Sequence, residues 1–482
     1  MDTRASVPVS LPRANPTTSY WQDPPDPQLS DYLSSPTVSE TADIVIIGSG
    51  ITGAGIAWNL LGGEDCLTQQ DQKERIVMLE ARQACSGATG RNGGHTKAAS
   101  YRTFLSNSTI SLSTAKKIAR LEYATIKGVH AFASAHNINC DSWTGDTVDI
   151  MYDKEQWEAS LKGIEAIREA FKGEEDEGTV GRYNIWSAEE ARDKWSVDGK
   201  GVVGAVSYEA GSLSAYKFVL GVLKLCLSKG LDLYTNTPAT KLSRGHDGSW
   251  NIDTPRGRIK AKKIVLATNG YTAFLHRDFQ GSIVPLRGQI TAHRPGSNMP
   301  SSGLPGTYSF IYSNGYEYMI PRPPGSKHAG DIVIGGGLVK ADEEGLYEFG
   351  ETDDTNLNST ISQYLAETTP RYFGEAWGSD DVEGRVRREW TGIMGYSSDG
   401  FPFVGEVPGR DNGALYVCAS FQGHGMVLCW LCARALVGIM RGEKEEGELE
   451  WFPEVFRVSK ERMGRRFEGK LNTKVGEVDG SS

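Results

Sequence analysis

The residues with the clearest chemistry form a short glycine loop: Gly48-Ser49-Gly50-Ile51-Thr52-Gly53. The loop directly follows an apolar, β-branched run at 42–47 and precedes an apolar helical pattern at 54–61. In this setting the first glycine permits a tight turn, the second lets the backbone approach a pyrophosphate, and the third lets helix and strand pack closely. Free N–H groups at the start of the helix also attract phosphate. We therefore predict that all six residues bind a dinucleotide.

A second strand pattern at 75–80 ends in Glu80, in the position from which a carboxylate accepts hydrogen bonds from a ribose. A polar insert at 62–73 lengthens the spacing between the loop and Glu80. Strand, glycine loop, helix and strand together predict a βαβ nucleotide-binding unit. This unit alone suits NAD and FAD equally.

A second loop of small residues follows Glu80 and distinguishes between these two cofactors. Its small side chains allow close backbone approach, and the guanidinium of Arg91 can offset phosphate charge. The choice of FAD over NAD rests on the family that this loop resembles, since an enzyme that binds only a nicotinamide has no use for such a loop. The residues of this stretch that we predict to bind the cofactor are Ala81, Arg82, Ser86, Gly87, Thr89, Gly90, Arg91, Asn92, Gly93 and Gly94.

The second loop resembles that of the D-amino-acid-oxidase-like superfamily of FAD-dependent oxidoreductases, which includes glycine oxidase, sarcosine oxidase and gamma-glutamylputrescine oxidase. Further segments at 263–270, 285–289, 398–405 and 421–426 are similar to landmarks of that superfamily. The resemblance extends from about 42 to 442, and the wording of the loop is similar to a fungal branch. It implies an FAD cofactor and a fold in which a nucleotide-binding domain and a substrate domain share the chain.

The resemblance places two more segments beside the flavin. The first is Thr268-Asn269-Gly270, at the end of a buried strand pattern. The second is Gly423-His424-Gly425-Met426, which we expect to open an apolar helix. The partial positive charge at that helix start would stabilise the negative charge of a reduced flavin.

Three residues are candidates for the catalytic side of the site. His95 and Lys97 directly follow the second loop and could line the flavin face, although an ordinary loop role is equally open. Arg287 could hold a substrate carboxylate, or form a structural salt bridge. Aromatic residues of the expected substrate domain, Tyr312, Tyr316 and Tyr318, are candidates for the pocket wall.

We expect the FAD to be non-covalent. Sarcosine-oxidase-like relatives tether it through a cysteine shortly before the final glycine segment, and residues 390–396 contain no cysteine. Some relatives use a histidine just after the second loop, so His95 is the alternative tether.

The implied reaction is oxidation of the C–N bond of an amine or amino acid. Hydride passes to flavin N5, the imine hydrolyses, and oxygen accepts the electrons to give peroxide. One alternative is an FAD-dependent dehydrogenase of a hydroxy acid or polyol phosphate with another acceptor. An alternative of a different class is a flavin-binding redox sensor without turnover.

The pattern of elements predicts an α/β chain, α+β overall, with a Rossmann-type FAD-binding domain interleaved with a mixed β-sheet substrate domain. The expected FAD-binding parts are 41–110, 196–285 and 380–445, and the expected substrate parts are 111–195 and 286–379. Residues 1–40, rich in Pro, Ser and Thr, are expected to be a disordered or loosely docked lead-in. Residues 446–482 are expected to form a C-terminal helix and tail.

The composition limits the possible partners. The net charge of -10 comes from scattered residues and disfavours binding to nucleic acid or anionic lipid. Seven irregularly spaced cysteines argue against a disulfide framework. Cys429 and Cys432 have no second Cys or His pair nearby, so we expect two apolar helix residues and no metal site. Without a secretory signal, a membrane-spanning run or a C-terminal Ser-Lys-Leu, the expected location is the cytoplasm.

Overall fold

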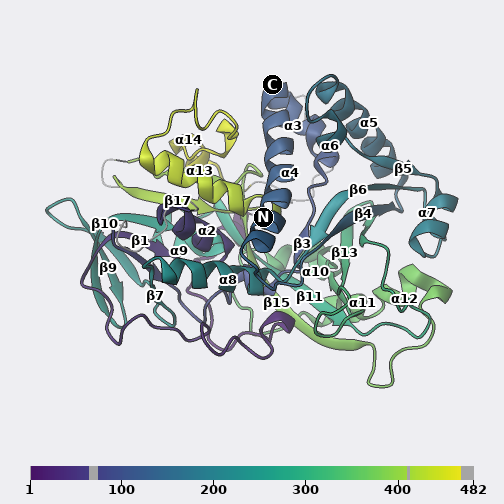
Figure 1. The fold of residues 1–482 in the computed structure, drawn as a ribbon, viewed down its shortest axis with the longest axis horizontal. Coiled ribbons are helices and arrows are strands. Elements are labelled where there is room, and N and C mark those ends of the chain that lie inside the picture. The colour runs from purple at the N-terminus through teal and green to yellow at the C-terminus, as the bar shows by residue number, and fades with distance from the viewer. Residues whose placement is uncertain (1, 64–73, 410–412, 468–482) are drawn as a thin grey trace.

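The computed structural model describes residues 2–63, 74–409 and 413–467, which contain two β-sheets lying side by side (Figure 1). Most of the polar insert at 62–73, and the expected tail beyond 467, lie outside the described residues. The α/β fold class with a nucleotide-binding sheet and a second mixed sheet is confirmed.

The first sheet has a parallel centre. Its parallel strands, in spatial order, are β17 (Leu415–Ala419), β10 (Gly257–Leu266), β1 (Thr41–Ile47), β2 (Ile76–Leu79) and β7 (Asp232–Tyr234). Antiparallel strands extend it: β16 (Phe403–Glu406) pairs with β17, β9 (Trp250–Thr254) pairs with β10, and β8 (Lys241–Arg244) pairs with β9. The carboxyl ends of β1, β2 and β10 therefore meet at one edge, where α/β sheets bind ligands.

The β-branched run of β1 is buried on both faces. Ile44 and Ile46 pack in the cluster that contains helices α2 (Ile51–Leu60), α8 (Ala215–Ser228) and α13 (Cys429–Arg441). Val45 and Ile47 pack on the opposite face, with residues of β9. This two-sided burial explains why the strand reads as a continuous apolar run in place of an alternating one.

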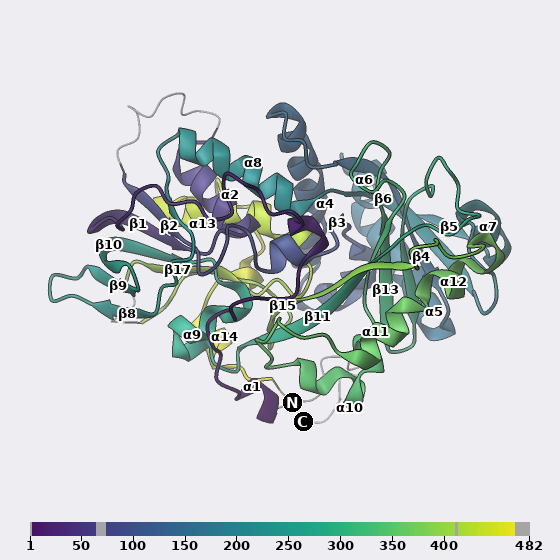
Figure 2. The ribbon, with the colours of Figure 1, turned by 90° about the horizontal axis from the view of Figure 1, so that it is seen from below.

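The second sheet is mixed. In spatial order its strands are β15 (Val386–Ser397), β11 (Ile283–His293), β14 (Ile332–Gly335), β13 (Gly315–Pro321), β12 (Thr307–Tyr312), β4 (Trp143–Met151), β6 (Gly204–Ser212) and β3 (His95–Thr96), with β5 (Asn184–Trp186) paired to β6. Strands β4 and β12 pair in parallel, and the other described pairs are antiparallel. The long β11–β15 ladder brings the second sheet against the nucleotide-binding loops, as Figure 2 shows near the centre of the molecule.

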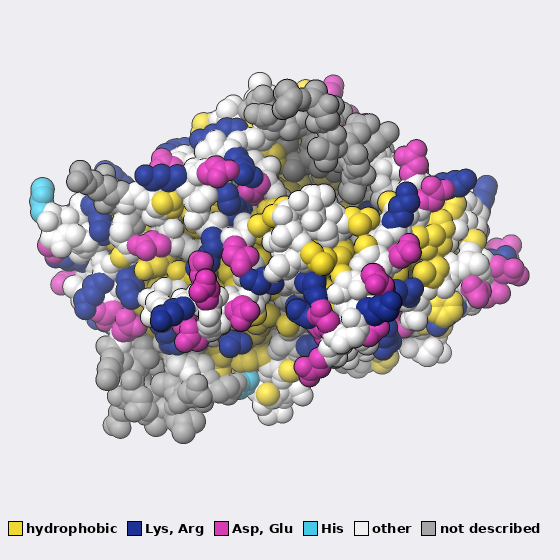
Figure 3. Space-filling view, turned by 90° about the horizontal axis from the view of Figure 1, so that it is seen from above, with side chains coloured by type: hydrophobic (Ala, Val, Ile, Leu, Met, Phe, Trp, Pro, Cys, Tyr) yellow, Lys and Arg dark blue, Asp and Glu magenta, His cyan; other side chains and the backbone are white. Residues whose placement is uncertain are grey.

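The remaining helices surround the two sheets. They are α1 (Asp2–Ala5), α3 (Phe104–Ile110), α4 (Leu112–Ala135), α5 (Lys154–Phe171), α6 (Glu177–Val180), α7 (Ala188–Trp195), α9 (Thr272–Leu275), α10 (Asp342–Gly345), α11 (Ser359–Ala366), α12 (Thr368–Phe373) and α14 (Lys460–Gly464). Among the described residues no helix is both long and apolar enough to cross a bilayer. On the face seen in Figure 3, acidic and basic side chains are interspersed, as expected from the scattered charges of the sequence.

Three strands pair differently from what the expected domain ranges suggest. Strands β3, β6 and β15 lie within 41–110, 196–285 and 380–445, which we assigned to FAD binding, yet all three belong to the second sheet. A strand pattern gives the period of side chains but not the identity of a distant partner strand. The exact domain limits therefore remain a prediction.

The first forty residues depart from the expectation of a disordered or loosely docked lead-in. Trp21, Leu29 and Val38 are buried against the body of the protein. Backbone and side-chain hydrogen bonds to distant residues fix much of the rest. Hydrogen bonds and single aromatic side chains hold the segment against the body of the protein. Because it has few apolar residues, its composition did not predict this packing.

Candidate functional site

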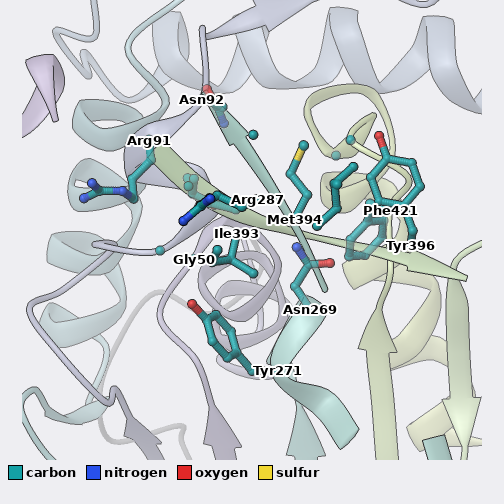
Figure 4. A pocket seen from close by; sticks show the side chains of 18 of the residues that line it. Gly50, Arg91, Asn92, Asn269, Tyr271, Arg287, Ile393, Met394, Tyr396 and Phe421 are labelled. Carbon is teal, nitrogen blue, oxygen red and sulfur yellow. The ribbon is translucent and has the colours of Figure 1, made fainter. Parts of the chain in front are cut away.

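A cavity of about 390 Å³ lies where the carboxyl ends of β1, β2 and β10 face the second sheet. Figure 4 shows Met394, Tyr396 and Phe421 together on one side of it, and Arg91 and Arg287 on the other. Most of the predicted cofactor residues line it: Gly48, Ser49, Gly50, Ile51, Thr52, Glu80, Ala81, Arg82, Gly87, Thr89, Arg91, Asn92, Thr268, Asn269, Gly423, Gly425 and Met426. The cavity thus brings together segments from five separate parts of the chain.

Two glycines of the first loop, Gly48 and Gly53, have a steric reason, and Gly50 begins a helix. Gly48 has a φ of +110°, and a Cβ there would lie 2.5 Å from the carbonyl oxygen of Ala267. A Cβ on Gly53, which does not line the cavity, would lie 2.0 Å from the carbonyl oxygen of Gly48. Gly50 is the N-cap of α2 and has no capping side chain. The loop therefore presents backbone, and a helix start without a capping side chain, to the cavity.

Glu80 is held at the end of β2 by groups of both loops. One carboxylate oxygen accepts the backbone N–H of Ser49 at 3.1 Å and its hydroxyl at 2.7 Å. The other accepts the backbone N–H of Arg82 at 3.0 Å. The carboxylate is thereby fixed at the cavity wall, as a ribose-binding acid requires.

Four predicted residues of the second loop, Ser86, Gly90, Gly93 and Gly94, do not line the cavity. The three glycines are close-packing positions instead. A Cβ would lie 2.1 Å from the carbonyl oxygen of Cys85 if placed on Gly90, and 2.5 Å from the Tyr318 ring if placed on Gly93. On Gly94 it would lie 2.0 Å from the carbonyl oxygen of Leu213. These glycines allow the loop to pack closely against its neighbours on the side away from the cavity.

Arg91 does not extend freely toward solvent or ligand. Its guanidinium is buried and donates to the carbonyl oxygen of Thr391 at 2.6 Å and to the hydroxyl of Thr17 at 2.7 Å. The buried carboxylate of Asp354 lies 3.7 Å from Arg91 and 2.9 Å from Arg82. Burial lowers the pKa of Arg91 to about 10. The Asp354 carboxylate is thus the buried counter-charge of both arginines. The sequence did not predict this partner.

The helix that follows the glycine segment Gly423–Met426 begins later than expected. Residues Gly425–Val427 form a 3₁₀ turn, and α13 starts only at Cys429, because Leu428 has a non-helical φ of -125°. Gly423 has a φ of +69°. The expectation of a helix opening at 423 is therefore corrected, although Gly423, Gly425 and Met426 do line the cavity.

Two neighbours in these segments act in packing. His424 does not line the cavity, and its Nε2 lies 3.0 Å from the carbonyl oxygen of Ala98. A Cβ on Gly270 would lie 2.4 Å from the carbonyl oxygen of Met394, which explains the glycine without a ligand.

Cys429 and Cys432 are buried on α13, and burial raises the pKa of both thiols. Their surroundings fit the apolar role expected for them.

The catalytic candidates His95 and Lys97 are not among the cavity-lining residues. His95 Nε2 lies 2.7 Å from the Thr307 hydroxyl, and burial holds its pKa well below the usual range. The Lys97 ammonium is buried and pairs with Asp149, which also accepts the hydroxyl of Tyr208 at 2.8 Å. Both side chains are satisfied by partners in the second sheet.

Arg287 lines the cavity but already has a partner. Its Nε and Nη2 donate to the two carboxylate oxygens of Glu348, at 2.7 and 3.2 Å. Its Nη1 donates to the carbonyl oxygen of Asp353 at 3.1 Å. The geometry therefore matches the salt-bridge alternative for Arg287.

The wall contributed by the second sheet is largely aromatic. Tyr312, Tyr316 and Tyr318 all line the cavity. Sequence reasoning did not identify several further wall residues, among them Leu11, Pro12, Tyr271, Phe349, Ile393, Met394 and Tyr396. For Tyr396, its position in a strand directly before the final glycine segments was the available signal.

The residues of the cavity fit FAD. Glycine backbone, the start of α2 and Glu80 match the pyrophosphate and ribose of a dinucleotide. Among the described residues, the Nη1 of Arg91 and the hydroxyl of Tyr271 are buried at this cavity without a hydrogen-bond partner. Buried donors usually have a partner, so these two suit an anionic ligand.

The comparisons agree with this geometry. The sequence model of a family described as FAD dependent oxidoreductase, abbreviated DAO, matches residues 43–439. Gamma-glutamylputrescine oxidoreductase of Escherichia coli (strain K12) is 22% identical over 436 residues, covering 89% of this chain and 90% of that protein.

Two solved structures share the fold. Glycine oxidase from Geobacillus kaustophilus superposes with a TM-score of 0.66 at 18% identity, covering 87% of this chain and 99% of that one. L-Amino acid deaminase from Proteus myxofaciens superposes with a TM-score of 0.67 at 13% identity, covering 90% and 96%. Because the family match spans most of the sequence, this chain belongs to the DAO family of FAD-dependent oxidoreductases.

Proposed function

We propose that the enzyme oxidises the C–N bond of an amine or amino acid. The observation that carries the proposal is the continuity of one cavity from the glycine loops to the aromatic wall of the second sheet. Relatives named for amine and amino-acid substrates support the same class. FAD supplies a two-electron acceptor for the hydride at the carbon beside nitrogen.

The proposed role of the aromatic wall is to desolvate the substrate. Tyr318, Tyr396 and Phe421 place rings at the cavity, and Met394 adds an apolar thioether. An apolar wall disfavours the charged ammonium form, and only a neutral amine has the lone pair that assists hydride departure. The imine product is then hydrolysed to a carbonyl compound and an amine or ammonia.

We propose that the two glycine loops and Glu80 hold the dinucleotide, and that Gly423 to Met426 lie beside the flavin. His95 and Lys97 support the second sheet, since their polar atoms contact Thr307 and Asp149. Arg287 with Glu348 forms a neutral pair at the wall. We also propose non-covalent FAD, because β15 contains no cysteine and the His95 ring is hydrogen-bonded to the Thr307 hydroxyl.

Oxygen is the proposed electron acceptor, so peroxide should accompany turnover. Purified enzyme in air should produce peroxide with members of a panel of primary amines, secondary amines and amino acids. A matched panel of hydroxy acids and polyol phosphates should produce none. Peroxide from the second panel alone would replace the proposal with hydroxy-acid or polyol-phosphate oxidation. Amine turnover only with an artificial electron acceptor would keep the substrate class but identify a dehydrogenase.

A further inference from the structure

The N-terminal strap, residues 9–22, lies outside the range matched by the family but against the cofactor cavity. The family match begins at residue 43. In Figure 2 the purple N-terminal segment runs from α1 past β15 to the centre of the molecule, beside the nucleotide-binding loops. Leu11 and Pro12 of the strap line the cavity. Part of the cavity wall therefore comes from a segment that precedes the family domain.

The strap binds the outer side of the second glycine loop. The Ser19 hydroxyl donates to the carbonyl oxygen of Gly90 at 2.7 Å, and the Trp21 indole N–H donates to that of Asn92 at 2.6 Å. Between them, the carbonyl oxygen of Arg91 accepts the indole N–H of Trp390 at 2.7 Å. Three consecutive carbonyl groups of the loop are thus satisfied from outside the loop, two of them by the strap.

Steric fit adds to these hydrogen bonds. The Gln22 amide donates to the carbonyl oxygen of Cys85 at 3.2 Å, and a Cβ on Gly90 would lie 2.3 Å from the same amide nitrogen. Trp21 is buried, with the guanidinium of Arg322 4.7 Å from its ring centroid. The backbone oxygen of Cys85, 2.1 Å from such a Cβ, is what requires glycine at position 90, and the Gln22 amide packs in the space that the missing side chain leaves.

The strap also contacts Arg91, one of the arginines that line the cavity. The hydroxyl and carbonyl oxygens of Thr17 both accept hydrogen bonds from Nη2 of Arg91. The Thr17 backbone N–H donates to the carbonyl oxygen of Asp354 at 2.8 Å. The strap thereby fixes the direction of the Arg91 guanidinium, whose Nη1 remains without a partner at the cavity.

We propose that the strap is part of the FAD-binding site. It holds the second glycine loop, through the carbonyl groups of Gly90 and Asn92, in the conformation that FAD requires, and it closes the cavity with Leu11 and Pro12. Without these bonds the loop is free to leave its binding conformation, and FAD binding must then also order the loop. The proposal concerns cofactor affinity and does not depend on the substrate.

The test uses Ser19→Ala and Trp21→Phe in the full chain, alone and combined. Phenylalanine retains a buried ring but loses the indole N–H. Ser35→Ala is the matched control, because its hydroxyl contacts Tyr234 of β7, 2.8 Å away, and not the loop. Apoprotein is prepared by acid removal of FAD, and FAD is then titrated while its fluorescence is followed. Circular dichroism confirms that each apoprotein is folded.

Each single variant should bind FAD about fivefold more weakly, as the loss of one hydrogen bond predicts, and the double variant at least about tenfold. The rate of FAD release should rise correspondingly, while Ser35→Ala matches the unaltered protein. Unchanged affinity in a folded double variant would overturn the proposal, as would an equal loss in Ser35→Ala. If Trp21→Phe fails to fold, Ser19→Ala alone decides, since it removes one hydroxyl.

Discussion

Replacing Gly50 with valine should weaken FAD binding about 100-fold or more while the apoprotein remains folded. A Cβ at this position would lie 3.0 Å from the Thr89 hydroxyl oxygen, which accepts the backbone N–H of Ile51 at 3.1 Å. The branched side chain would displace Thr89 and fill the space at the start of α2 where the pyrophosphate should bind. Overpacking costs about 3 kcal/mol at its upper range, so FAD affinity should fall about 100-fold or more.

Absorbance at about 450 nm after purification, together with FAD titration of apoprotein, measures this loss. Gly178→Val is the steric control, because a Cβ at Gly178 meets no atom within 4 Å and the residue does not line the cavity. It should bind FAD normally. A Gly50→Val variant that retains one FAD per chain would show that the first glycine loop does not hold the pyrophosphate.

Replacing Asp354 with asparagine should destabilise the apoprotein by about 3–5 kcal/mol. Asparagine keeps the shape of the side chain but leaves the guanidinium groups of Arg82 and Arg91 without their buried counter-charge. Both arginines line the cavity, where the negative pyrophosphate can replace part of that charge. The loss of stability should therefore be smaller in the FAD-bound protein than in the apoprotein.

Chemical unfolding of both forms measures this difference. Asp381→Asn is the control, since its carboxylate is 38% exposed and lies 3.9 Å from Arg294, so about 1 kcal/mol or less is expected. If FAD did not reduce the effect of Asp354→Asn, these arginines would not contact the bound pyrophosphate. If Asp354→Asn cost no more than the control, the buried charge cluster would not matter for the fold.

The nucleotide-binding unit could be predicted because its signals are local. The apolar run of β1, the spacing of Gly48, Gly50 and Gly53, and the position of Glu80 all lie within one short stretch of sequence. Each has a steric or electrostatic reason that does not depend on distant residues. The family resemblance adds the prediction that Thr268 and the final glycine segment also bind the cofactor.

Features that depend on distant partners could not be predicted. The sequence predicts that Arg91 offsets phosphate charge. It does not predict that Asp354, far along the chain, lies near the guanidinium as a counter-charge. The strap has no apolar pattern from which its docking could be predicted. Hydrogen bonds from Ser19 and Trp21 to a loop far along the sequence hold it in place. The later start of α13, at Cys429, is a local feature that was also not predicted, because no glycine or proline marks the non-helical φ of Leu428 in the sequence.

Anaerobic bleaching of the bound flavin tests the central proposal most directly. Enzyme with one FAD per chain is mixed, without oxygen, with a panel of amines and amino acids and with a matched panel of hydroxy acids and polyol phosphates. We expect absorbance at about 450 nm to fall with at least one amine or amino acid, because reduction removes the band of the oxidised flavin, and to stay unchanged with the second panel. Bleaching by a hydroxy acid or polyol phosphate alone, with none by any amine or amino acid, would contradict the proposed C–N oxidation.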